Sequence, residues 1–191
     1  MALHQSNFKA DLTRYCYYCS GPHVIRLLQC WSIPGFQAVA VYRFGQWAKQ
    51  RNLAIRLLAD PLYLVLNFWI KTAWGIGLPR SARIGRGFYI GHFGGIQISG
   101  AAQIGANCNI SHEVTIGVSG TGSKRGVPII GDNVYIAPGA KLFGLIRIGN
   151  NVKIGANAVV YKDIPDNAVV VLDPGYKIVS MAGNPNPNQV N

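Results

Sequence analysis

The sequence predicts a mainly β protein, a parallel β-solenoid preceded by an α-helical region, and three observations carry this prediction. Aliphatic side chains return every six residues from Ile84 to Val160, with two interruptions. This spacing fits neither a helix of about 3.6 residues per turn nor an isolated alternating strand, so it indicates a repeat architecture. Gly, Ala or Ser follows most of these aliphatics, and a second small or apolar residue precedes most of them by two positions. The first 75 residues lack this pattern.

Each repeat is expected to form a short flat strand and a corner, with the aliphatic side chain inside and a small residue at the tight bend. The predicted inward positions are Ile84, Ile90, Ile98, Ile104, Ile110, Ile116, Ile130, Ile136, Leu142, Ile148, Ile154 and Val160. If three hexads make one coil, Ile110 lies directly above Ile90, and His112 lies above His92 at the same offset. Neighbouring parallel strands are about 4.8 Å apart, so the two imidazoles would share one edge of the solenoid.

Residues 1–75 are expected to be helical. The segment 36–51 begins after a Pro-Gly break and places apolar side chains in one sector, although Arg43 falls in the same sector. The segment 53–74 is apolar on nearly all sides and should bend or restart at Asp60-Pro61, because proline suits the first turn of a helix. This segment either packs on the solenoid end and on a neighbouring subunit, or it touches a membrane surface.

Length and composition bound the organisation of the chain. With 191 residues and 49% apolar content it can bury a core, which suits one domain plus an appendage. We expect a helical region over 1–75, a solenoid over 76–172 and a tail over 173–191. Residues 1–14 lack the order of a signal peptide, so a cytoplasmic location is expected. The longest apolar run, 61–70, is shorter than the about 20 residues of a membrane span, so no span is expected.

The chain is strongly basic, with 18 Lys and Arg, 7 Asp and Glu, and a net charge of +11. A basic surface attracts nucleic acid, an anionic membrane or a polyanionic small molecule. Nucleic acid is the weakest of the three, because no basic run is interleaved with aromatic residues. The basic N-terminal helices could instead make peripheral contact with a membrane.

The four cysteines are expected to be thiols, and no metal is expected. Cys16 and Cys19 form a CxxC pair, but no second pair of ligands at matching spacing accompanies them. Cys108 occupies a small inward position of the repeat and is expected in the core.

The repeat breaks twice, and both breaks point to function. Between Ile90 and Ile98 the spacing grows to eight, in the segment His92-Phe93-Gly94-Gly95. Between Ile116 and Ile130 it grows to fourteen, and the segment GVSGTGSKRGVP must leave the solenoid as a loop. Insertions that a regular scaffold tolerates tend to carry function, so a site is predicted at the histidine pair, next to this loop.

These features arrive in a recognisable order. The hexads, the histidine-containing insertion, the Gly-rich loop and the closing KDIPDNAVVV resemble the hexapeptide-repeat acyltransferases, and within them the serine acetyltransferase family. The branch found with exopolysaccharide and colanic-acid synthesis is the most similar. The resemblance implies a left-handed parallel β-helix, assembly as a homotrimer with active sites between subunits, and acetyl-CoA as co-substrate along the solenoid edge.

The resemblance also implies the roles of individual residues. His92 corresponds to the general base, and histidine suits this role because it titrates near neutral pH and an alcohol is a weak nucleophile there. Either Glu113, from the coil above or from the neighbouring subunit, or a backbone carbonyl would orient His92. The expected acetyl-CoA groove is lined by Gly117, Gly139, Ala140 and Lys153. His112 is expected to meet the acceptor, and Lys124 and Arg125 to meet the acceptor or phosphates.

The acceptor side departs from the serine-specific pattern. Gly91 and the segment 76–79 stand where that pattern has carboxylates, and Gly126 follows Arg125 where it has histidine. An amino-acid acceptor needs an anion for its ammonium group, so we expect a sugar hydroxyl of a polysaccharide or its precursor. The alternative is serine O-acetylation that feeds cysteine biosynthesis. Two further alternatives are a metal enzyme using His92, His112 and Glu113, and a non-catalytic scaffold or membrane-surface adaptor.

Overall fold

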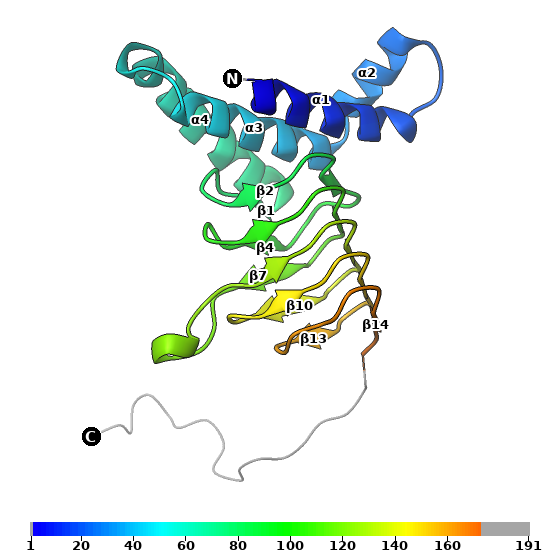
Figure 1. Cartoon of the computed structure of the whole chain (residues 1–191). Coiled ribbons are helices and arrows are strands. Elements are labelled where there is room, and N and C mark those ends of the chain that lie inside the picture. The colour runs from blue at the N-terminus through cyan, green and yellow to red at the C-terminus, as the bar shows by residue number, and fades with distance from the viewer. Residues whose placement is uncertain (1, 173–191) are drawn as a thin grey trace, which may run out of the picture.

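The computed structural model describes residues 2–172, in which four helices precede a column of stacked coils (Figure 1). The helices are α1 (Ala2–Tyr17), α2 (His23–Trp31), α3 (Pro34–Lys49) and α4 (Leu53–Trp74). Gly75 ends α4 with a left-handed backbone, at φ 62°, and the first strand begins at Ile76. The predicted tail, 173–191, lies outside the described residues.

Three parallel sheets form the walls of the solenoid. The first contains β1 (Ile76–Gly77), β4 (Ile96–Ile98), β7 (Thr115–Gly117), β10 (Lys141–Phe143) and β13 (Val159–Val160). The second contains β2 (Arg83–Ile84), β5 (Gln103–Ile104), β8 (Ile129–Ile130) and β11 (Arg147–Ile148). The third contains β3 (Tyr89–Ile90), β6 (Asn109–Ile110), β9 (Tyr135–Ile136), β12 (Lys153–Ile154) and β14 (Val169–Val170). The chain visits the three sheets in turn, so three hexads make one coil.

The predicted core of the solenoid is confirmed. Every repeat aliphatic from Ile84 to Val160 is buried, and Ile110 pairs directly with Ile90 below it and Ile136 above it. Cys108 is also buried, as expected. The six-residue repeat therefore specifies both the inward face and the register of the stack.

Asparagines at the corners were not predicted. Asn133, Asn151 and Asn167 all have φ near the left-handed region, at 57°, 57° and 62°. Asparagine tolerates this conformation better than other residues with a Cβ. The Asn133 side-chain amide donates to Asn151 Oδ1 at 3.1 Å, and the Asn151 amide donates to Asn167 Oδ1 at 3.0 Å. The same residues thus close the bends and join successive coils.

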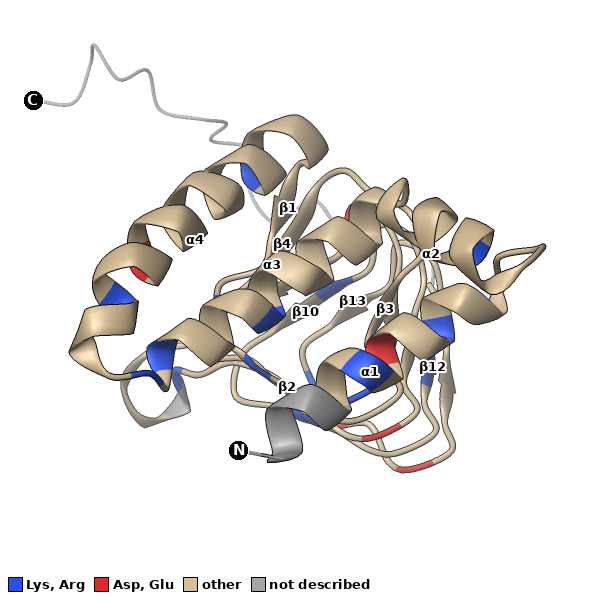
Figure 2. Cartoon of the chain, turned by 90° about the horizontal axis from the view of Figure 1, so that it is seen from above, with Lys and Arg blue, Asp and Glu red and all other residues tan. Residues whose placement is uncertain are grey.

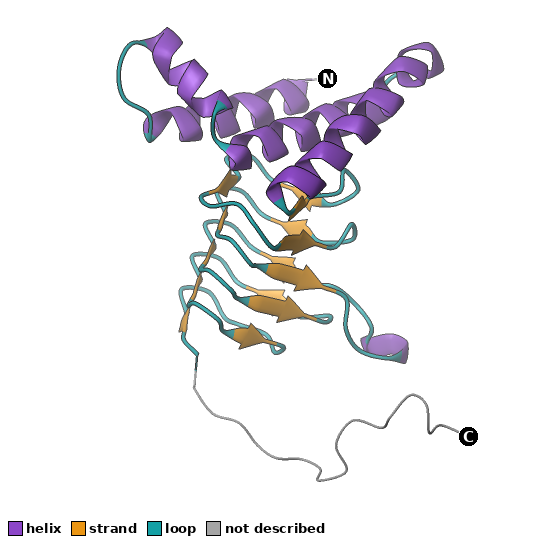
Figure 3. Cartoon of the chain, turned by 180° about the vertical axis from the view of Figure 1, so that it is seen from behind, coloured by secondary structure: helices purple, strands orange, loops and turns teal. Residues whose placement is uncertain are grey.

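The helices lie across the end of the solenoid that carries β1, β2 and β3 (Figures 2 and 3). Helix α3 lies against this end at Gly35, where an added Cβ would collide with the Ile90 carbonyl oxygen. Phe36 and Val39 of α3 are fully buried beside the solenoid core. The four helices, which we call the helical cap, and the first coil therefore share one hydrophobic core.

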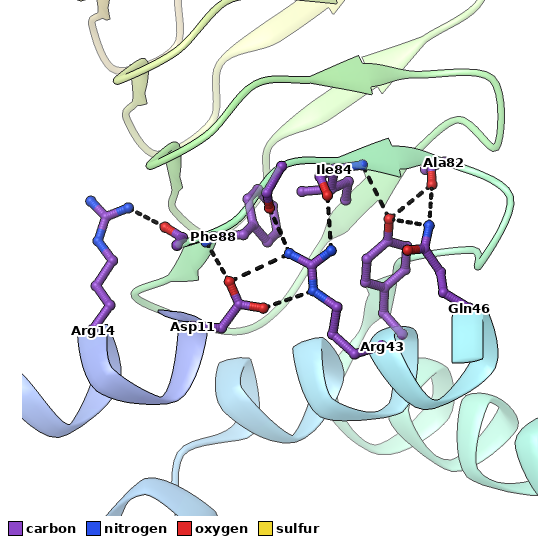
Figure 4. Close-up of polar contacts among 10 residues, drawn as sticks. Asp11, Arg14, Arg43, Gln46, Ala82, Ile84 and Phe88 are labelled. Atoms are coloured by element: carbon purple, nitrogen blue, oxygen red, sulfur yellow. Dashed lines mark hydrogen bonds and ion pairs between the residues drawn. The ribbon is translucent and has the colours of Figure 1, made fainter. Parts of the chain in front are cut away.

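A buried ion pair joins the cap to the edge of the first coil, which no preceding coil covers (Figure 4). Arg43 Nε donates to Asp11 Oδ2 at 2.7 Å, and both side chains are almost completely buried. The Arg43 guanidinium also donates to the Ile84 carbonyl at 2.8 Å and to the Gly85 carbonyl. The Phe88 N–H donates to Asp11 Oδ1 at 2.8 Å. Burial raises the pKa of Asp11, and its hydrogen bonds from Arg43 and Phe88 oppose that shift.

Two tyrosines complete the coverage of the edge. Tyr42 accepts from the Ile84 N–H at 3.1 Å and donates to the Ala82 carbonyl at 2.8 Å. Tyr15 accepts from the Ile90 N–H at 2.8 Å. Side chains of α1 and α3 thus replace the hydrogen-bonding partners that a preceding strand would supply. Arg43, which lay awkwardly in an apolar sector of the sequence, is part of this arrangement.

Helix α4 differs from one part of the sequence prediction at Pro61. It continues through Pro61 and does not restart there. Among residues 2–172 it is also the one single helix long and apolar enough to cross a membrane; α2 with α3 meets the same test only as a pair bent by 84°. Length and composition alone do not make α4 a membrane span, so the expectation that the chain does not cross a bilayer stays a prediction.

Replacing Asp11 by alanine is expected to lower the free energy of unfolding by about 3–5 kcal/mol, because the Arg43 charge stays buried without its partner. Urea unfolding followed by circular dichroism measures this loss. The double variant Asp11→Leu, Arg43→Met should lose less than the sum of the single variants D11L and R43M. Strictly additive losses would show that the two side chains act independently.

Candidate active site

The predicted histidine pair is present at one corner of the solenoid. His92 follows β3 and His112 follows β6, at the turn where the chain passes to β4 and β7. Because Ile90 pairs with Ile110, the two histidines stack at the same offset. Their ring centroids are 5.7 Å apart, with the ring planes at 81°. The juxtaposition derived from counting hexads is confirmed.

His92 is exposed, and no described residue forms a hydrogen bond with its ring. The carboxylate of Glu113 likewise has no hydrogen-bonding partner within residues 2–172. The backbone of Glu113 does have partners, since its N–H donates to the Gly94 carbonyl at 2.8 Å and its carbonyl accepts from the Lys141 ammonium. Within one chain, Glu113 therefore holds the His92 insertion through its main chain. The expected carboxylate–imidazole hydrogen bond is not formed there.

Both glycines of the insertion have a positive φ, and Gly95 also lies against Glu113. A Cβ on Gly95 would lie 3.0 Å from Glu113 Cγ, and the backbone of Gly95 has a φ of 65°. Gly94 has a φ of 102°, and a Cβ there would meet no heavy atom within 4 Å. The backbone beside His92 is thus tight on the side of Glu113 and open at Gly94.

An aromatic pair that the sequence analysis missed lies next to His92. Phe93 is 51% exposed and packs edge-on against Trp74, with ring centroids 5.3 Å apart. Trp74 is the last residue of α4, and its indole N–H donates to Gln37 Oε1 at 2.9 Å. The position of Phe93 inside the first interruption was the available signal. Its contact links the end of α4 to the histidine corner.

Two of the expected groove residues lie in the coil above His112. The Gly139 N–H donates to the His112 carbonyl at 3.0 Å. Its φ is 73°, and an added Cβ would collide with Asn157 Oδ1, so the fold favours glycine there. Ala140 is fully buried in the core. Its methyl group points into the solenoid, so only its main chain is left to line the expected groove.

The remaining expected site residues are spread along the solenoid. Gly117 ends β7 beside the Phe143 ring, and Lys153 lies exposed on β12 in another sheet. Arg125 is exposed in the loop that leaves after β7 and contains the short helix η1 (Gly122–Lys124). The histidine corner precedes β7 and this loop follows it, so they lie at opposite ends of the strand. The expected proximity of loop and histidines is not found within one chain.

The described residues contain no group of three or more His, Cys, Asp or Glu side chains placed to hold a metal ion. A cluster of free thiols lies between α1 and α2. Cys16 Sγ lies 3.2 Å from Cys30 Sγ, and Cys19 Sγ lies 3.7 Å from it. Burial raises the pKa of Cys30, and it also raises that of Cys108, to about 11. Both thiols are therefore poor nucleophiles.

Similar proteins identify the family. A serine acetyltransferase from Helicobacter pylori is 36% identical over 138 residues, which cover 72% of this chain and 77% of the relative. The chain belongs to the serine acetyltransferase family. Another family member, from Synechococcus elongatus, is 35% identical over 151 residues, but the match spans 79% of this chain and only 59% of that protein. No family model matches the chain.

The solved structures of the family agree with this fold. The structure of Neisseria gonorrhoeae serine acetyltransferase in complex with serine has a TM-score of 0.72 and 30% identity, covering 93% of this chain and 70% of that one. A soybean serine acetyltransferase complexed with serine has the same TM-score at 31% identity, over 91% and 69%. The chain is a left-handed parallel β-helix with N-terminal helices, as the resemblance implied.

The replacement Gly139→Ala is expected to destabilise the fold by about 1–2 kcal/mol or more, because it forces a Cβ into the left-handed region against Asn157. Thermal unfolding measures this change. Gly91→Ala is the matched control at the corresponding corner two coils below, since Gly91 lacks a positive φ and its Cβ would meet only the Tyr89 ring edge. Equal losses in the two variants would contradict a conformational requirement at Gly139.

Proposed function

We propose that this chain is an acetyl-CoA-dependent O-acetyltransferase with His92 as its general base. The observation that carries the proposal is the position of His92, exposed on an insertion at the solenoid corner in a member of the serine acetyltransferase family. His92 accepts the proton of the acceptor hydroxyl as that oxygen attacks the thioester carbonyl. The imidazolium then protonates the CoA thiolate as the carbon–sulfur bond breaks.

The open backbone at Gly94 suits the other half of this chemistry. Backbone N–H groups of Gly94 and Gly95 would donate to the tetrahedral oxyanion. Glycine at position 94, where no heavy atom lies within 4 Å of an added Cβ, allows the thioester to approach the main chain closely. Gly117, Gly139, the main chain of Ala140 and the exposed Lys153 remain our proposed contacts for acetyl-CoA.

The site is proposed to be completed between subunits of a homotrimer. Within one chain, the loop that carries Arg125 leaves from the far end of β7, away from His92. A neighbouring subunit would bring its own loop to the histidine corner, where Arg125 and His112 would contact the acceptor. We further propose a cytoplasmic location, where acetyl-CoA is available.

L-Serine is the first candidate for the acceptor. The relatives are named serine acetyltransferases, and two of the matching solved structures contain serine. These comparisons favour serine over the polysaccharide sugar that the sequence analysis preferred. They also give no support to the exopolysaccharide branch in particular.

A neutral hydroxyl acceptor, such as a sugar, is the second candidate, and two observations favour it. Glu113 is the only carboxylate next to the histidine corner among the described residues, and neither Gly91 nor the segment 76–79 supplies another. Phe93 presents an exposed ring beside His92. An aromatic face can pack against the C–H face of a sugar ring, and a sugar hydroxyl needs no buried counter-ion.

Replacing His92 by alanine is expected to lower kcat/KM for acetyl transfer by about 10²–10⁴-fold, the usual contribution of a positioned general base. CoA release measures this rate. Glu113→Gln keeps the main chain that positions the insertion, so it should retain the rate within a few fold. A loss in E113Q as large as in H92A would show that the carboxylate orients His92, through contacts that one chain does not form.

The acceptor can be identified by comparing CoA release with L-serine, nucleotide sugars and oligosaccharides. If serine is the acceptor, Phe93→Ala should leave its KM nearly unchanged, because serine has no ring to pack. If a sugar is the acceptor, F93A should raise KM by about tenfold, as expected for the loss of about 1.4 kcal/mol of stacking. If neither L-serine nor the sugar acceptors caused release of CoA, the proposed function would be contradicted.

A further inference from the structure

Helix α4 exposes a broad apolar face on the outside of the molecule. Leu58 is 81% exposed, Val65 66% and Trp69 59%. The other large apolar side chains exposed on this helix are Leu53, Ile55, Leu57, Leu62, Leu64 and Phe68. Contiguous apolar surface of this kind marks an interaction site.

The polar side chains of α4 are confined to one flank. Its buried residues, Ala59, Tyr63 and Ile70, are spaced four and seven residues apart and form one narrow stripe. Arg56, Asp60, Asn67 and Lys71 follow the same spacing and therefore line the edge of this stripe. About half of the helix circumference is left apolar and uncovered within residues 2–172.

Contacts along the length of α4 show that it lies against the protein and does not project from it. Tyr63 packs so closely on α3 that a Cβ on Gly45 would collide with its ring. The Tyr63 hydroxyl accepts from the Arg80 N–H at 3.1 Å, and Arg80 also forms an ion pair with Asp60. Because one side of α4 is held against the protein, the helix can enter a lipid surface only by lying flat in the plane of the interface.

The charges of the helical cap complement an anionic surface. Residues 2–75 contain eight Lys and Arg and two acids. Both acids are paired, Asp11 with Arg43 and Asp60 with Arg56 and Arg80. Figure 2 shows basic positions spread over all four helices. The exposed Lys49 and Lys71 have no acidic partner among the described residues, so the cap carries an uncompensated positive charge.

A second apolar surface lies on the same cap. Helix α2 exposes Val24, Leu28 and Trp31, with 66%, 64% and 52% of their surfaces accessible. Tryptophan and basic residues around an apolar face are the composition of helices that lie in the interface of anionic bilayers.

We propose that the helical cap docks on an anionic lipid bilayer, with the apolar face of α4 entering the interface and the cap cations contacting the headgroups. A second copy paired with this chain through α4 about a two-fold axis fits this face less well. A symmetric pairing through α4 would bring Lys49 and Lys71 of one chain toward the same cations of the other. Lipid headgroups supply the opposite charge instead.

The test is flotation of the full chain with vesicles of equimolar phosphatidylglycerol and phosphatidylcholine, compared with vesicles of phosphatidylcholine alone. We expect at least about tenfold stronger binding to the anionic vesicles, and weaker binding at high salt. The double variant Leu58→Glu, Val65→Glu should bind about a hundredfold more weakly, because two apolar side chains no longer enter the interface. Circular dichroism checks that the variant is folded.

The matched control is Val159→Glu, Val169→Glu, which makes the same change at two exposed valines on the solenoid, 56% and 68% accessible. This control should bind vesicles within about twofold of the original chain. Equal binding of L58E/V65E and the original chain would overturn the proposal. The proposal would also be overturned if the original chain did not bind the vesicles. A change in mass of L58E/V65E, measured by light scattering, would then show that another copy of the chain covers α4.

Discussion

The structure depends on satisfying the open edge of the first coil. Each later coil receives backbone hydrogen bonds from the coil before it, but the first has no predecessor. Unpaired backbone groups at such an edge destabilise the fold when they are buried, and they promote pairing with another chain when they are exposed. Here α1 and α3 supply Asp11, Tyr15, Tyr42 and Arg43 to those groups. The helices are therefore the structural beginning of the solenoid.

This cap also fixes the position of the histidine corner. The edge residues held by Tyr15 and Gly35 belong to β3, and His92 follows β3 after a single glycine. A rigid start to the stack keeps His112 above His92 in the next coil, since the register admits no slip without exposing the aliphatic interior. The geometry of the site is thus set largely by contacts made outside it.

The sequence predicted what local periodicity controls and missed what tertiary contacts decide. Hexads specified the core and the stacking of His112 over His92, because register follows from counting. Arg43 looked misplaced, since its partner Asp11 is on another helix and its carbonyl acceptors are in the first coil. The main-chain contact of Glu113 with Gly94 was missed for a similar reason. The left-handed φ of Glu113, 59°, turns its main chain toward Gly94, and no sequence pattern predicted that turn.

The outward helix and the site are physically connected. Trp74 ends α4 and packs on Phe93, the residue after His92. A helix of 22 residues is about 33 Å long, so a bilayer on the face of α4 would extend from its start to the neighbourhood of the histidines. A docked enzyme would then meet acceptors held near the lipid surface at much higher local concentration than acceptors in solution. Docking would thereby select among acceptors through their location, a form of specificity that the few polar groups at the corner need not provide.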